Sequence, residues 1–306
     1  KNMIAAGKYF NPLPALYLFP RGDDFDNVRL YQRWDESRNL YTQAWDYGSG
    51  DMSFQNPYWI MNKMINQTKK RRYMLSANLK YDVTDWLDVT GRVKVDNADM
   101  DITEKRYAGT DTNFAGEKGM YSIIKRNDRQ IYADAIANID LTFAGDYHLS
   151  ANVGASLKDV RMDFMGWGGD LRKIPNFFSI TNISTTNYKE REDGSHIQSQ
   201  SIFANVELAW KSMLYLTVTG RNDWESALAF SKYKSFFYPS VGLSAVVSNM
   251  VNMPEWFTFL KVRGSYSKVA SAFARYLSNP AYSFNNQTHN WSKPSTYPAY
   301  NLKPED

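Results

Sequence analysis

The stretch from residue 73 to residue 96 alternates between apolar and polar side chains over most of its length. The apolar positions of its two halves are Leu75, Ala77, Leu79 and Tyr81, then Leu87, Val89, Val93 and Val95. Residues two apart on a β-strand share a face, so this period predicts strands rather than a helix. The segment Asp82-Val83-Thr84-Asp85 between the halves predicts the turn of a β-hairpin.

Each strand of this hairpin has about ten residues, the length that a tilted strand needs to cross a bilayer. Tyr81 and Trp86 flank the predicted turn, and aromatic residues at such positions are typical of the girdle of a membrane barrel. We therefore expect the apolar face to contact lipid and the polar face to line a lumen. A slip of one residue would place Arg92 and Lys94 in hydrocarbon, at about 2–4 kcal/mol each near the midplane.

The same alternation recurs in three further pairs of segments, within residues 129–157, 202–221 and 237–266. Short turns such as Ala144-Gly145-Asp146 alternate along the chain with long connections, as in outer-membrane barrels with short periplasmic turns and long extracellular loops. The predicted fold class is all-β: about eight strands of a transmembrane antiparallel β-barrel.

This pattern divides the 306 residues into three parts of one partial barrel domain. Residues 1–71 are expected to form a long extracellular loop region with one strand near Leu40 to Trp45. Residues 72–268 would form four hairpins, with residues 97–128 and 159–199 as long connections. Residues 269–306 would form a loop that leads to a further strand. The basic run at residues 69–72 suits a solvated face or a contact with lipid headgroups.

The composition favours a membrane barrel but does not exclude a soluble protein. Aromatic residues make up 15% of the chain, which suits a barrel with aromatic girdles. No run of about 18 apolar residues could form a spanning helix. The net charge of +4 is spread over both signs and shows no nucleic-acid footprint, and the chain has no cysteine. The 43% of hydrophobic residues would also allow a soluble core.

Charged residues on the polar face are candidates for chemistry or for structure. A glycosidase needs two carboxylates across a sugar, but basic residues share this face, so structural ion pairs are the better interpretation. The expected lumen-facing ion pairs involve Asp88, Arg92, Asp134, Glu207, Arg221 and Arg263. No phosphate loop or nucleophile elbow occurs, so we predict neither catalysis nor a cofactor.

Metal binding has one weak candidate, a calcium site at Asp96, Asp99 and Asp101. The segment lacks the glycine and the terminal glutamate of a calcium loop, so a solvated loop is the alternative. The three histidines are far apart in sequence, which argues against a zinc site.

Aromatic residues in the predicted outer loops are candidates for substrate binding, because flat rings stack on sugars and on apolar side chains. These candidates are Trp45, Tyr58, Trp59, Trp167 and Trp291. The alternative for each residue is that it packs the loops together.

Six short segments resemble, in the same order, the barrel region of SusC-like TonB-dependent outer-membrane transporters. They are Asn56-Pro57-Tyr58-Trp59, residues 81–87, residues 220–224, residues 237–241, residues 260–266 and residues 301–305. The resemblance implies active import of oligosaccharides, or less readily of oligopeptides, across the bacterial outer membrane. It also implies a SusD-like surface lipoprotein as partner and TonB as the source of energy.

The resemblance further implies a barrel of roughly 22 strands with an N-terminal plug. We therefore expect this chain to hold about a third of such a barrel, without the plug and the C-terminal strands. Two alternatives remain open: a soluble all-β module that binds glycans, and a passive outer-membrane porin.

Overall fold

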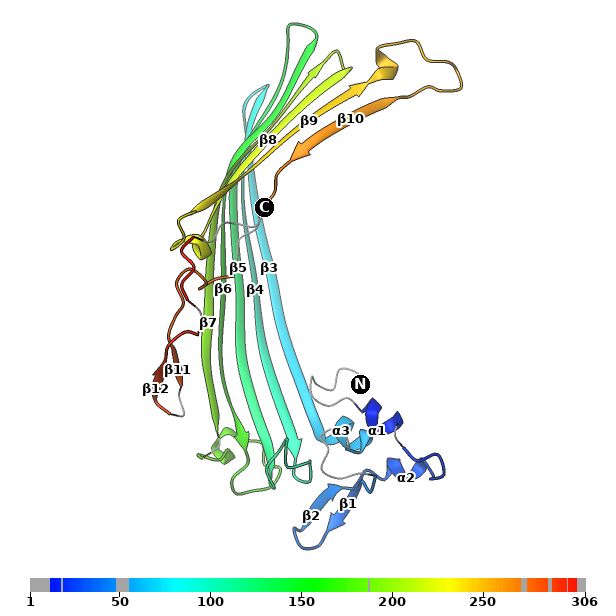
Figure 1. Ribbon diagram of the computed structural model, residues 1–306, viewed down its shortest axis with the longest axis vertical. Helices are drawn as coiled ribbons and strands as arrows, with labels where there is room; N and C mark the ends of the chain where they lie inside the picture. The colour runs from blue at the N-terminus through cyan, green and yellow to red at the C-terminus, as the bar shows by residue number, and fades with distance from the viewer. Residues whose placement is uncertain are drawn as a thin grey trace. The chain divides into compact units, whose positions relative to one another are not determined.

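The computed structural model describes residues 12–17, 19–47, 55–186, 188–270, 274–285, 288–295 and 297–301. Its main feature is a sheet of eight strands that lie side by side in sequence order (Figure 1). These strands are β3 (Met64–Thr84), β4 (Leu87–Tyr107), β5 (Gly119–Phe143), β6 (Tyr147–Asp170), β7 (Lys189–Trp210), β8 (Leu214–Glu225), β9 (Ser235–Val246) and β10 (Lys261–Ser267). The sheet confirms the predicted all-β class and the number of strands.

Contacts divide the chain into two compact units. The first unit comprises Lys1–Arg72, Ala98–Asp128 and Met162–Gly194. The second unit comprises Tyr73–Asn97, Arg129–Arg161 and Ser195–Asp306. Each of β3 to β7 contributes residues to both units.

Several strands are longer than the alternation predicts. Strand β4 runs on to Tyr107, β6 runs on to Asp170, and β7 begins at Lys189. The predicted long connections at residues 97–128 and 159–199 are therefore wrong in extent. Strand β3 also begins earlier, at Met64. In the added parts of β4 and β6, the positions that continue the apolar series, such as Asn97, Asp99 and Asp159, are polar or charged, so the pattern on which the prediction rests is lost there.

The first hairpin turn lies later than predicted. Strand β3 includes Val83 and Thr84, and only Asp85 and Trp86 form the turn. Val83 and Thr84 are β-branched, which favours a strand. Trp86 thus lies in the turn itself, and its carbonyl accepts a hydrogen bond from the backbone N–H of Asp140 at 2.9 Å.

The second hairpin turn lies at residues 144–146, as predicted. Ala144 and Gly145 both have positive φ, of 50° and 73°, and glycine adopts this conformation at little steric cost. Phe143 and Tyr147 close the strand ends with stacked rings 5.6 Å apart. The two rings lie where an aromatic girdle is expected.

The described part of residues 12–63 is more structured than a loop (Figure 1). It contains the elements α1 (Leu13–Tyr17), α2 (Asp26–Arg29), β1 (Gln32–Asp35), β2 (Leu40–Gln43) and α3 (Pro57–Lys63). Strand β2 covers most of the segment predicted near Leu40 to Trp45, and it pairs with β1 in a hairpin that the sequence did not indicate.

Asn56 explains why helix α3 begins where it does. Its Oδ1 accepts hydrogen bonds from the backbone N–H groups of Tyr58 and Trp59, at 2.9 and 3.4 Å. Asparagine is a preferred helix N-cap, and proline is favoured at the position after it. Asn56 Nδ2 donates to the carbonyls of Val28 and Ala44, both at 2.9 Å. One buried amide therefore joins three segments of the first unit.

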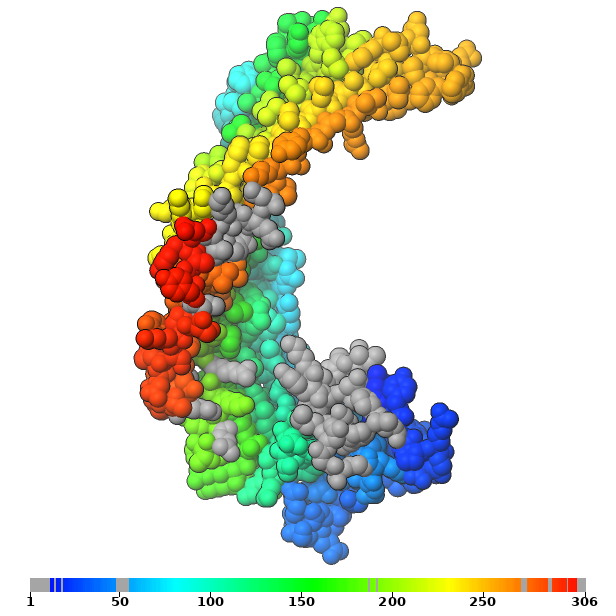
Figure 2. Space-filling view, in the orientation of Figure 1, coloured from blue at the N-terminus to red at the C-terminus, as the bar shows by residue number. Residues whose placement is uncertain are grey.

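The second unit exposes one apolar face of its strands. We call this the apolar face, and we call the opposite one the polar face. Its large aliphatic side chains, which are 37–75% exposed, are Leu75, Leu79, Val89, Val93, Val153, Leu157, Ile202, Leu216, Val218, Val241, Leu243 and Val262. In Figure 2 the side chains of β9 and β10, coloured yellow to orange, lie open at the surface. An apolar surface of this extent is typical of contact with a membrane or a partner.

The residue type on the apolar face changes abruptly along the long strands. On β4, Val95 is followed on the same face by Asn97 and Asp99, and on β6 Leu157 is followed by Asp159. On β5, Arg129 precedes Ile131 in the same way. Beyond this change the face is polar and charged, which marks the level at which an apolar environment would end.

The remaining elements are short. They are the 3₁₀ turns η2 (Ile180–Asn182), η3 (Ser226–Leu228) and η4 (Val247–Asn249), and the hairpin of β11 (Ser283–Asn285) and β12 (Asn290–Ser292). Among the described residues, no helix is long and apolar enough to cross a membrane. The motif expected at residues 301–305 lies outside the described residues from residue 302 onward.

Candidate functional site

The polar face of the second unit carries a well-formed ion pair. Arg92 on β4 donates from Nε and Nη2 to the two carboxylate oxygens of Asp134 on β5, at 2.9 and 2.7 Å. The Asp134 side chain is fully buried, whereas 52% of the Arg92 side chain is exposed. Two parallel hydrogen bonds fix the guanidinium group against the carboxylate, so this pair holds two adjacent strands in register.

Loss of this ion pair should weaken the sheet. We expect Arg92→Met to lower the free energy of unfolding by about 2 kcal/mol, less than for a fully buried pair because Arg92 is half exposed. Urea denaturation of the full-length protein in lipid vesicles measures the effect. The double variant Arg92→Met with Asp134→Leu should recover most of the loss, since no buried carboxylate would remain. Equal losses in the single and double variants would contradict this account.

A second polar network surrounds Asp88. Its carboxylate lies 3.4 Å from Lys80 Nζ and accepts a hydrogen bond from Asn138 Nδ2 at 2.7 Å. Asn138 Oδ1 in turn accepts from Asn152 Nδ2 at 2.8 Å. The network crosses strands β3 to β6 and consists of groups that can also bond to the hydroxyls or amides of a polar ligand.

The other residues expected on the polar face have varied partners. Arg221 Nε lies 2.7 Å from Asp223, and its Nη2 donates to the Ser201 hydroxyl at 2.9 Å. Glu207 accepts from the Thr217 hydroxyl at 3.2 Å, so its described contact is with a neutral side chain. Arg263 is exposed on β10, opposite Ser244 of β9. These geometries fit a polar wall of the sheet and show no pair of carboxylates placed for catalysis.

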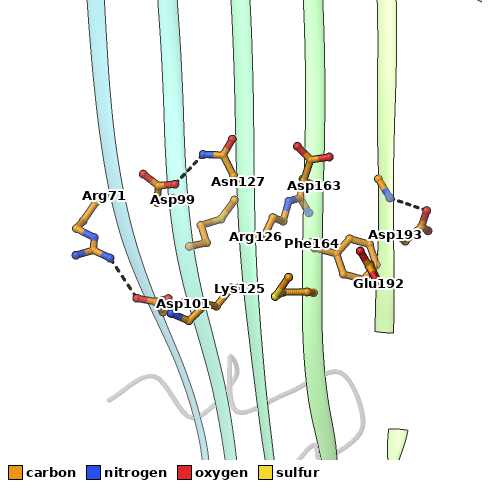
Figure 3. A pocket seen from close by; sticks show the side chains of 13 residues that line it. Arg71, Asp99, Asp101, Lys125, Arg126, Asn127, Asp163, Phe164, Glu192 and Asp193 are labelled. Atoms are coloured by element: carbon orange, nitrogen blue, oxygen red, sulfur yellow. Dashed lines mark hydrogen bonds and ion pairs between the residues drawn. The ribbon is translucent and has the colours of Figure 1, made fainter. Parts of the chain in front are cut away.

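The first unit contains a charged pocket of about 660 Å³ (Figure 3). Arg71 Nη2 lies 3.4 Å from Asp101, and Asn127 Nδ2 donates to Asp99 at 2.7 Å. Lys125 also lines the pocket. The side chains at 71, 99, 101, 125 and 127 lie an even number of residues apart within their strands, so on each strand they share one face.

The weak calcium candidate is not supported by this geometry. Asp99 and Asp101 share one face of β4, but Asp96 lies on the other face because an odd number of residues separates it from each of them. Asp101 faces Arg71, and Asp99 faces Asn127. Among the described residues, no group of three histidine, aspartate or glutamate side chains is placed to hold a metal ion.

Trp59 is a packing residue in this structure. It is 0% exposed and forms a core with Ile60 and Met64. Its indole N–H donates to the Thr110 hydroxyl at 3.0 Å. The prediction that Trp59 contacts substrate is therefore wrong, because the packing of this unit covers the whole ring.

The other four aromatic candidates differ in their access to a ligand. Tyr58 is half-buried on α3, and Trp45 is half-buried with its ring 5.2 Å from that of Tyr47. Burial raises the pKa of the Tyr47 hydroxyl, with a further contribution from Asp23, so this aromatic group stays neutral. Trp291 is the most accessible candidate, at 68% exposed, and packs on Phe284 with ring centroids 5.0 Å apart.

Trp167 is placed differently from its prediction. It lies within strand β6 rather than in a loop, and it is 37% exposed. By alternation it shares a face with Asp163 and Met165, which line the charged pocket. Trp167, Trp45 and Tyr58 belong to the first unit, and Trp291 belongs to the second.

Sequence reasoning missed two groups of residues. The charged pocket was not predicted because most of its side chains belong to strand segments that were predicted as loops. The polar or charged residues at every second position, Asn97, Asp99 and Asp101, are the signal that could have revealed these strands. The links from Asn56 to Val28 and Ala44 join residues far apart in sequence, and no local pattern indicates them.

Comparison with known proteins gives consistent results. A family model described as "TonB dependent receptor-like, beta-barrel" matches residues 15–306. TonB-dependent receptor P26 of Formosa agariphila is 24% identical over 243 residues, which cover 75% of this chain and 24% of that protein. The chain thus spans about a quarter of the length of this relative.

Two solved structures share the fold. The RagAB peptide transporter matches with a TM-score of 0.71 at 16% identity, over 85% of this chain and 30% of that one. The RagAB peptide importer in its open-open state matches with a TM-score of 0.72 at 17% identity, over 86% of this chain and 30% of that one. These likenesses show that the sheet shares the fold of part of those two structures.

Proposed function

Because the chain belongs to the TonB-dependent receptor-like β-barrel family, we propose that it forms part of the wall of an active importer in the bacterial outer membrane. The observation that carries the proposal is the contrast between the two faces of strands β3 to β10. One face is apolar and exposed, and the other holds hydrogen-bonded polar groups such as Arg92 and Asp134. A strand in a membrane barrel needs lipid on one side and a polar lumen on the other.

The proposed energy source is TonB, acting through a plug domain of the full-length protein. A plugged lumen opens only when the plug moves, so transport would require energy even along a gradient. We propose a SusD-like surface lipoprotein as the partner that covers the extracellular loops. Residues 56–59 and the later motifs resemble SusC-like transporters, and this resemblance supports the proposal of such a partner.

The proposed substrates are oligosaccharides. The amide and carboxylate network of Asp88, Asn138 and Asn152 offers donors and acceptors that suit sugar hydroxyls. Trp291 and Phe284 present exposed rings of the kind that stack on pyranose faces. Oligopeptides are the second candidate, because one of the solved structures described above is a peptide transporter and the other is a peptide importer.

Uptake by cells tests both parts of the proposal. A strain lacking the full-length gene, with and without the gene restored, is given labelled oligosaccharides or labelled oligopeptides. We expect restored cells to take up the oligosaccharides at least tenfold faster, and loss of TonB to abolish this difference. Uptake that persists without TonB would indicate a passive porin. If the cells took up only the peptides, and only with TonB present, oligopeptides would replace oligosaccharides as the proposed substrates. The proposal that TonB supplies the energy would stand.

A further inference from the structure

The connection between β6 and β7 forms an ordered loop over residues 171–184, within the first unit (Figure 1). Asn182, which is 6% exposed, organises this loop. Its Oδ1 accepts hydrogen bonds from the backbone N–H groups of Lys173 and Ile174, at 3.1 and 3.2 Å. Its Nδ2 donates to the carbonyls of Ile174 and Phe177, at 2.8 and 3.0 Å. One buried amide therefore fixes the backbone of the loop at three positions.

The loop is also fixed to the ends of β4 and β5. Asn176 Oδ1 accepts a hydrogen bond from the backbone N–H of Ala108 at 2.7 Å. The backbone N–H of Asn176 donates to the Lys118 carbonyl at 3.0 Å. The ring of Phe178 packs on that of Tyr107, with the centroids 4.9 Å apart. All these contacts lie within the first unit, so the conformation of the loop requires no bound partner.

Three large apolar side chains of this ordered loop face solvent. They are Ile174, Phe177 and Ile180, which are 56%, 51% and 49% exposed. Burial of apolar surface stabilises a complex, and a loop that is already ordered loses little conformational entropy when a partner covers it. Exposed apolar side chains on a fixed backbone are therefore typical of a contact with another protein.

The charges beside these three residues are mainly basic. Arg172 and Lys173 are exposed in the loop, and Lys118 Nζ donates to the Arg172 carbonyl at 3.1 Å. The sequence from residue 171 to residue 189 contains no acidic residue. The carboxylate of Asp170, next to the loop, accepts a backbone hydrogen bond at 2.8 Å. A partner that covers the loop should therefore carry acidic side chains around an apolar centre.

The loop joins strand ends that the short turns do not join, and the long loops of an outer-membrane barrel lie on the extracellular side. From the fixed backbone, the apolar side chains and the basic rim, we propose that this loop is a docking surface for the surface lipoprotein. Ile174, Phe177 and Ile180 form its apolar centre, and Arg172 and Lys173 lie at its rim. This inference rests on the lipoprotein partner of the proposed function. A separate folded chain gains most from a surface that is ordered in advance.

Photo-crosslinking in intact cells identifies what covers the loop. The full-length protein carries p-benzoylphenylalanine in place of Phe177, and we expect a crosslink to a separate, lipid-anchored protein, which mass spectrometry identifies. The same group in place of Phe178 is the matched control. It should crosslink within the chain, because Phe178 packs on Tyr107 and lies 6.1 Å from Tyr121 between ring centroids. A crosslink from position 177 only to another part of the same chain, or only to lipid, would overturn the docking surface.

Binding of the purified lipid-anchored protein to the full-length protein in detergent gives the size of the effect. The triple variant Ile174→Ser, Phe177→Ser and Ile180→Ser should weaken the affinity at least tenfold. Arg172→Glu with Lys173→Glu should slow association, because charges at a rim act mainly on the association rate. Leu30→Ser changes another exposed apolar residue of the same unit, 70% exposed, and should leave the affinity unchanged.

Hydrogen exchange separates a lost contact from a lost fold. The backbone amides of residues 173 and 174, which donate to Asn182, should keep their protection in each of these variants. If no lipid-anchored protein copurifies with the full-length protein, the proposed partner itself is wrong. If one copurifies and binds the triple variant with unchanged affinity, the partner stands and this loop is not its docking surface.

Discussion

Val218→Arg is expected to lower the free energy of unfolding by about 2–4 kcal/mol, the range for a basic residue near the middle of a lipid-facing barrel strand. Val218 lies on the apolar face of β8, between Val206 of β7 and Val241 of β9. An arginine at this position would lie between the two valines of the neighbouring strands. Guanidinium denaturation of the full-length protein in lipid vesicles, followed by tryptophan fluorescence, gives the change.

The neighbouring residue provides the control for this prediction. Thr217 lies on the polar face, opposite Glu207 of β7 and Gly242 of β9. Thr217→Arg adds the same charge and bulk, but the new guanidinium group would meet a carboxylate and a position without a side chain. We expect a change within about 1 kcal/mol for this variant. Equal losses at residues 217 and 218 would contradict the assignment of the two faces.

Trp59→Ala is expected to cost about 3–5 kcal/mol of local stability, the range for removing a buried aromatic side chain. The exchange leaves a cavity beside Ile60 and Met64, and it leaves the Thr110 hydroxyl without the indole donor. Hydrogen exchange of the backbone amides of α3 should speed up by at least a hundredfold, which corresponds to about 3 kcal/mol. The amides of strands β8 and β9 should keep their protection.

Two companion variants test whether Trp59 is structural. Trp59→Phe keeps a ring and loses the indole hydrogen bond, so we expect a cost of about 1–2 kcal/mol. Trp291→Ala should leave exchange in α3 unchanged and weaken binding of the transported ligand, since Trp291 is exposed. If Trp59→Ala weakened ligand binding without any change in exchange, Trp59 would contact the ligand after all.

The part of the fold that alternates between apolar and polar residues could be predicted from the sequence, because its surroundings impose a regular pattern on the residues. Lipid outside and polar groups inside impose a period of two residues, and a one-residue error is costly. The positions of Leu75, Val93 and Val218 follow from that rule alone. Past Val95 and Leu157 the positions that continue the apolar face are polar or charged, as at Asp99 and Asp159, so the lipid-facing pattern ends there. The extent of β4 and β6 could therefore not be read from the pattern.

The candidate site was less predictable because it depends on contacts between distant residues. The type of residue suggested that Arg92 and Asp134 form ion pairs, but their pairing depends on the register between β4 and β5. The aromatic candidates shared one sequence signal, a ring in a polar stretch, which cannot distinguish the buried Trp59 from the exposed Trp291. The packing of Trp59 with Ile60 and Met64 and its hydrogen bond to Thr110 show that it belongs to a core.

The charged parts of strands β4 to β6 affect how the protein inserts into the outer membrane. Outer-membrane proteins arrive from the periplasm, so Asp99, Lys125 and Asp163 must cross the hydrocarbon before the apolar parts of the same strands can stop within it. Each basic side chain costs about 2–4 kcal/mol at the midplane, and acidic ones somewhat less. Moved together, these groups approach the total stability of a typical domain. We therefore expect insertion into pure lipid vesicles to be slow and a factor that opens a polar path through the membrane to speed it up.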